Sequence, residues 1–81
     1  MERARLLEHL AAARRHADEG QIRILKQKQL IATLGASGED TAAAEAGLHI
    51  LEETQHNHLD LIERLQDALD KIPVTQGDAQ S

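Results

Sequence analysis

The sequence predicts an all-α protein: an antiparallel two-helix hairpin that dimerises into a four-helix bundle. Two observations support the hairpin. Apolar residues recur at alternating steps of three and four in each half of the chain, and the segment Gly35-Ala36-Ser37-Gly38 separates the two halves. This spacing places the apolar residues of each half along one side of a helix.

The first half predicts one helix over about residues 3–34. Its other positions are mostly Ala, Arg, Glu, Gln and Lys, which favour helix. Gly20 is the weakest point, because glycine loses the most conformational freedom in a helix. The apolar seam of this helix consists of Leu6, Leu10, Ala13, Ala17, Gly20, Ile24, Gln27, Ile31 and Leu34.

The second half predicts a helix over about residues 41–71. It ends where Pro73 disfavours a helical conformation at Ile72. Residues 73–81 have no periodic pattern and predict a disordered tail of the single domain, residues 1–81. The seam of this helix consists of Ala44, Leu48, Leu51, Gln55, His58, Ile62, Leu65, Leu69 and Ile72.

Residues 35–40 form the predicted loop. Gly35 suits the left-handed residue that commonly follows a helix. Asp40, or alternatively Ser37 with Asp40 as its capping-box partner, can accept hydrogen bonds from the first amides of the second helix. A short loop makes the helices antiparallel neighbours, so that facing residues have numbers summing to about 75. Gly20 then faces Gln55, and Ala17 faces His58.

Charge is divided unequally between the two halves. Residues 1–34 carry seven Lys and Arg against four acids, a net charge of +3, whereas residues 39–72 carry nine acids against two bases, a net charge of −7. This division favours packing unlike helices together, although each exposed ion pair contributes only about 0.2–1 kcal/mol.

Several large apolar residues fall outside both seams, so a single hairpin cannot cover them. A lone domain of 81 residues also buries little surface for its length. Both points predict a homodimer in which each acidic helix lies between two basic ones. The residues predicted at this interface are Leu7, Ile22, Leu25, Leu30, Ile50, Leu59 and Leu61.

Two polar residues, Gln55 and His58, interrupt the second seam. Polar seam residues can fix the register and the number of helices in an assembly. The alternative is that His58 makes the interface responsive to pH, because a buried imidazole that gains a proton loosens its surroundings.

Some polar residues have metal-ligand spacing. His49 and His56 alternate with Glu45 and Glu52 on one helical face, and Glu53 and His56 have the Glu-x-x-His spacing of di-metal bundles. Glu19 would lie opposite on the first helix. The predicted register turns these side chains away from the seam, towards solvent. We therefore expect no metal and no other cofactor.

Composition argues against several other functions. The chain has no cysteine, which excludes disulfides and thiolate metal sites. No nucleophile motif or phosphate-binding loop is present, so we expect no enzymatic activity. The sequence also argues against nucleic-acid binding, since acids interrupt the basic strip of the first half and no aromatic residue can stack on bases. The chain also lacks an apolar run long enough to span a membrane, and we expect a cytoplasmic protein.

The chain resembles short bacterial helical-hairpin proteins of uncharacterised function. The resemblance covers residues 8–70 and implies a coiled hairpin in a bacterial setting, with no activity to transfer. It departs at Ala43, where such proteins often have an acidic residue. The matching segments are Arg14-Arg15-His16, residues 24–31, Gly38-Glu39-Asp40-Thr41-Ala42, and Glu52-Glu53-Thr54-Gln55 followed by His58.

The expected function is therefore noncatalytic protein contact, as a small self-associating adaptor or regulator with a possible further protein partner. The first alternative is a small metal-binding helical bundle. The second is a regulator linked to nucleic acid, such as an antitoxin partner.

Overall fold

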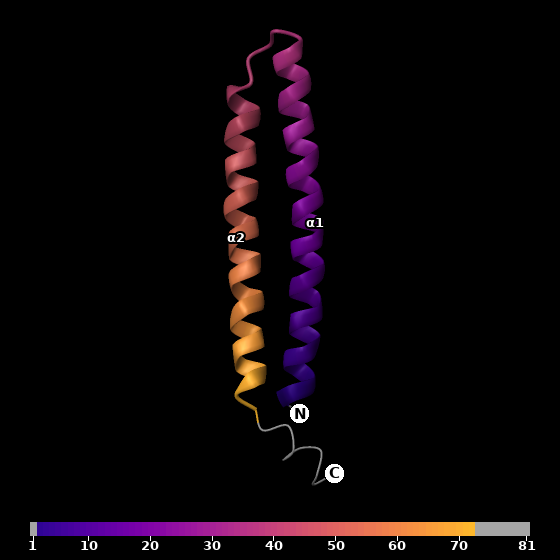
Figure 1. Ribbon diagram of the computed structural model, residues 1–81, viewed down its shortest axis with the longest axis vertical. Coiled ribbons are helices and arrows are strands. Elements are labelled where there is room, and N and C mark those ends of the chain that lie inside the picture. The colour runs from indigo at the N-terminus through magenta and orange to yellow at the C-terminus, as the bar shows by residue number, and fades with distance from the viewer. Residues whose placement is uncertain (1, 73–81) are drawn as a thin grey trace.

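Two long helices account for nearly all of residues 2–72, the part of the chain that the computed structural model describes. They are α1 (Glu2–Ala36) and α2 (Ala42–Asp70). Figure 1 shows them side by side and antiparallel, joined by a loop at one end. This arrangement confirms the all-α hairpin and extends its first helix by one residue at the start and two at the end.

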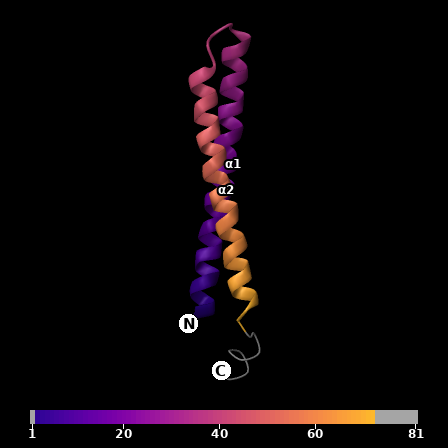
Figure 2. The same ribbon diagram turned by 90° about the vertical axis from the view of Figure 1, so that its left-hand side faces the viewer.

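The seam predicted from the sequence is the surface through which the helices pack. All eighteen seam positions are buried or half-buried. The predicted register is also confirmed, because the Gln55 amide lies against Gly20 and the Gln27 amide lies against Gly47. In the view of Figure 2 the helices cross one another, as expected for helices that follow a heptad seam.

The end of α1 differs from the prediction. Gly35 is still helical, and the left-handed residue is Gly38, with φ of 76°. The Glu39 amide donates to the Leu34 carbonyl at 2.9 Å, and the Gly38 amide donates to the Gly35 carbonyl at 3.0 Å. These two bonds make a Schellman motif, which satisfies the last carbonyls of the helix. The prediction at Gly35 is wrong because a second glycine three residues later lets the helix continue.

The start of α2 has a different cap from the one expected. Thr41 is the N-cap residue, and its hydroxyl donates to the Glu45 carboxylate, whereas the Asp40 carboxylate accepts from the Ala42 amide at 2.9 Å. Asp40 thus does accept a free amide, one residue before the cap. The alternative with Ser37 is wrong, because the Ser37 amide still donates to Thr33 of α1.

The other end of α2 closes with a hydrogen-bonded turn. The Lys71 amide donates to the Asp67 and Ala68 carbonyls, and the Ile72 amide donates to Leu69 at 3.1 Å. The predicted tail, residues 73–81, lies outside the described residues. Neither α1 nor α2 has a stretch apolar and long enough to cross a membrane.

The core of the hairpin is thin. Four hydrophobic residues, Leu10, Ala13, Ala17 and Ile24, are buried, and all four belong to α1. Most seam residues of α2 are large and only half-buried. Small residues of α1 therefore let α2 approach closely, but a second helix alone does not enclose the larger side chains of α2.

Candidate functional site

Large apolar side chains remain on the surface of the hairpin. The exposed ones are the seven that the sequence placed outside both seams, and their exposed fractions range from 43 to 62%. Covering one such half-exposed side chain would stabilise the protein by about 1 kcal/mol. These residues are Leu7, Ile22, Leu25, Leu30, Ile50, Leu59 and Leu61.

The two edges of the seam differ in charge. One, here called the charged edge, has opposite charges on the two helices and is exposed to solvent. Its rows repeat every seven residues and so lie along one side of each helix. The rows are Leu7, Arg14, Gln21 and Lys28 on α1, and Glu45, Glu52, Leu59 and Gln66 on α2.

The opposite edge, here called the low-charge edge, carries one Arg and no acid in its two rows. His9, His16 and Leu61 line a shallow depression on this edge, with the seam residues Ala13 and Leu65 at its floor. This shared depression shows that the rows of α1 and α2 lie on the same side of the molecule. The rows are His9, His16, Arg23 and Leu30 on α1, and Gly47, Thr54, Leu61 and Ala68 on α2.

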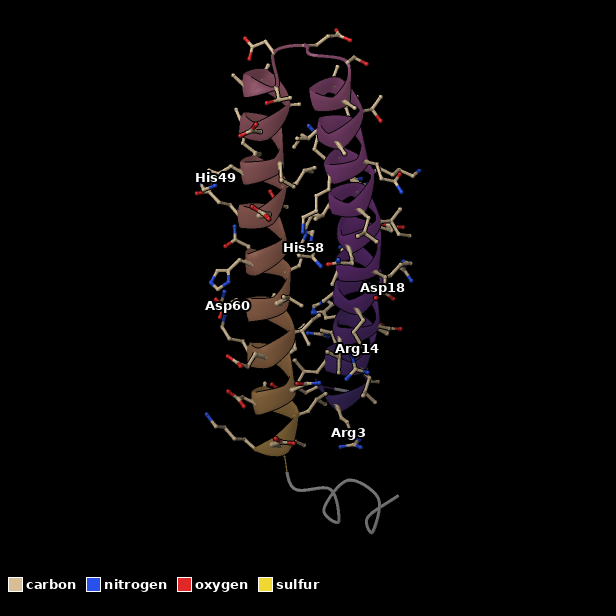
Figure 3. All side chains as sticks on the ribbon, turned by 45° about the horizontal axis from the view of Figure 1, so that its top comes forward. Arg3, Arg14, Asp18, His49, His58 and Asp60 are labelled. Atoms are coloured by element: carbon tan, nitrogen blue, oxygen red, sulfur yellow. The ribbon has the colours of Figure 1, made fainter. Side chains whose placement is uncertain are left out.

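Gln55 and His58 form a polar layer in the seam, and Gln55 bonds to the backbone of α1. Gln55 is 8% exposed, and its Nε2 donates to the Ala17 carbonyl at 2.7 Å. This bond turns Oε1 towards His58 Nδ1, 3.3 Å away. An amide oxygen only accepts, so this contact is a hydrogen bond when Nδ1 of His58 carries the proton. His58 points between the helices (Figure 3), with the His16 ring centre 6.0 Å from its own.

A second polar contact has the same form, but its glutamine belongs to α1 and its carbonyl to α2. Gln27 Nε2 of α1 donates to the Ala44 carbonyl of α2 at 2.7 Å and lies over Gly47. Gln55 of α2 has the same relation to Ala17 and Gly20 of α1. In each case the glycine stands three residues after the accepting alanine. The sequence analysis missed the Gln27 contact, although the two Ala-x-x-Gly segments level with seam glutamines were a signal for it.

These two contacts make the pairing of the helices specific. Each glutamine bonds to a carbonyl that also accepts within its own helix, so it uses the second lone pair of that oxygen. A shift of one residue would remove both bonds and leave the buried Gln55 amide unpaired, which costs about 1–3 kcal/mol. The two glutamine contacts are thus compatible with only one register of the helices, whereas His58 bonds within α2.

The metal-ligand candidates do not assemble into a site. His49, Glu53 and His56 line a shallow depression on the outer side of α2, and His49 Nε2 lies 3.5 Å from Glu53 Oε2. Figure 3 shows His49 pointing away from α1. Glu19 is exposed on α1, and within residues 2–72 no three His, Asp or Glu side chains converge. The His49 and Glu53 side chains are both mostly exposed to solvent.

No ion pair links α1 to α2 within the described residues. The two ion pairs there, His49 with Glu53 and Asp60 with Arg64, both lie on the surface of α2. The unequal charge of the helices therefore acts through the overall field and contributes little through direct contacts.

Comparison of the chain with known protein families, curated proteins and solved structures finds no match.

Proposed function

We propose that the protein is a noncatalytic contact module that works as a homodimer, with two hairpins forming a four-helix bundle. One observation supports this most strongly: seven leucine and isoleucine side chains are 43–62% exposed on a hairpin that buries only four hydrophobic residues. A second copy would cover part of this apolar surface, which a single two-helix hairpin leaves in contact with water.

The shape of the hairpin supports the same proposal. Two packed helices leave little interior in which to enclose a substrate, and the two depressions described above are open surface features. Contact with another protein surface is the activity that seven exposed leucine and isoleucine side chains on a hairpin suit best. The bundle would serve as an adaptor or regulator whose further partners bind its outer helical faces.

Sedimentation equilibrium of the purified chain tests the proposal. We expect a mass near twice the 8.9 kDa of one chain at micromolar concentration. A mass near 8.9 kDa throughout the micromolar range would refute self-association.

A further inference from the structure

We infer that the second copy covers the low-charge edge, with the loops of the two hairpins at the same end of the bundle. This inference rests on the proposed self-association and adds the surface and the orientation. Three features support it: the cost of removing each edge from water, the shape of the low-charge edge, and the charges of the two helices.

The first feature is desolvation. Packing a second copy on the charged edge would take Arg14, Lys28, Glu45 and Glu52 out of water, and even paired ions recover this desolvation cost only when their geometry is excellent. The low-charge edge has only Arg23, whose long side chain can keep its guanidinium in solvent while its methylenes pack. The low-charge edge is therefore the cheaper one to bury.

The second feature is shape. Gly47, Thr54 and Ala68 along the α2 row are small and let another helix approach closely. Leu30, Leu61 and the adjacent Ile50 project from the same side, with exposed fractions of 43–62%. This edge thus combines small side chains with projecting large ones, which suits interdigitation with a copy of itself.

The third feature, charge, decides the orientation. With the loops at the same end, the basic α1 of each copy lies beside the acidic α2 of the other. With the loops at opposite ends, α1 would lie on α1 and α2 on α2, which brings like net charges together.

Two matched leucines of α2 test the edge. Leu61 lies on the low-charge edge and Leu59 on the charged edge, and their exposed fractions are similar, 43 and 52%. We expect Leu61→Glu to lower the sedimentation mass to that of a monomer and Leu59→Glu to leave a dimer. If Leu59→Glu alone dissociates the dimer, if both variants do, or if neither does, the edge assignment is overturned, whereas self-association of the unmodified chain still stands.

Thiol accessibility tests the same edge without a disruptive charge. The chain has no cysteine, so a single one introduced by Thr54→Cys or by Glu52→Cys reports on its own edge. We expect the thiol at position 54 to react at least about tenfold more slowly at dimer-forming concentration than in the dissociated chain, which corresponds to about 1.4 kcal/mol of protection. The thiol at position 52 should react equally fast in both. Protection of position 52 alone, or of neither position, would overturn the edge assignment.

Energy transfer between fluorophores tests the orientation. Labels are attached through Ser37→Cys in the loop, and the hairpin is about 50 Å long at 1.5 Å per residue. Loops at the same end predict efficient transfer between donor- and acceptor-labelled copies. Loops at opposite ends predict weak transfer for this pair and efficient transfer between a copy labelled through Ser37→Cys and one labelled through Glu2→Cys. That second pattern would overturn the orientation.

Discussion

Replacing Ile24 by alanine is expected to lower the free energy of unfolding by about 2–5 kcal/mol per chain. Ile24 is 6% exposed and is one of only four buried hydrophobic residues in the hairpin. It lies in the seam between the two glutamine contacts, so its truncation opens a cavity where the helices are held closest. Urea unfolding followed by circular dichroism, at a fixed chain concentration, measures the change.

Ile22 provides the matched control for this prediction. It is the same residue type two positions earlier on α1, but it is 52% exposed and lies on neither edge of the seam. Ile22→Ala should change the free energy of unfolding by less than about 0.5 kcal/mol. Equal losses for the two variants would show that Ile24 is not the buried residue of the pair and that the register is wrong.

Replacing Gly20 by alanine should destabilise the protein by about 1–2 kcal/mol, although alanine favours helix by about 1 kcal/mol over glycine. An added Cβ would overlap Gln55 Oε1 and lie 3.1 Å from Gln55 Cδ. The Gln55 side-chain amide would have to move away from position 20, and its hydrogen bond to the Ala17 carbonyl would be lost. Since Gln55 is buried, the displaced amide has little access to water.

A double-mutant cycle isolates this effect. In a Gln55→Ala background the same Gly20→Ala change should stabilise by about 1 kcal/mol, giving a coupling energy of about 2 kcal/mol or more. Gly35→Ala is the control, because Gly35 is helical and exposed, and an added Cβ would meet only Thr41 Cγ2 at 4.0 Å. It should stabilise the protein in both backgrounds. No coupling between Gly20 and Gln55 would contradict the proposed contact.

The helical hairpin could be predicted from the sequence because the same apolar spacing occurs in both halves of the chain. The step of three and four residues identified every buried or half-buried seam position, and the short loop set the antiparallel direction. The same signal identified the seven exposed apolar side chains, since any large apolar residue outside a seam has no partner within a two-helix protein.

The helix ends were less predictable because several residues compete for each role. Gly35 and Gly38 can both adopt a left-handed conformation. Gly38 is the one that does so, because the Gly38 and Glu39 amides donate back to carbonyls of α1. Asp40 and Thr41 can both cap a helix, and both have side-chain bonds in the first turn of α2. Single-residue choices of this kind depend on loop geometry, which periodicity does not report.

The candidate site was only partly predictable. Gln55 and His58 stood out as polar residues in the second seam, whereas Gln27 was placed in the first seam without a role of its own. The role of Gln27 depends on Gly47 of α2, against which its amide packs. Pairing these two residues requires the interhelical register in addition to the sequence pattern. The difference between the two edges likewise emerges only when the rows of both helices are combined.

The central claim is that each hairpin is half of an assembly and depends on the second half for its stability. The most direct test is the thermal unfolding midpoint, measured by circular dichroism over about two orders of magnitude in chain concentration. Folding coupled to dimerisation predicts a midpoint that rises steadily with concentration, because mass action favours the dimer. A midpoint independent of concentration would mean that the hairpin folds alone, and it would contradict the claim.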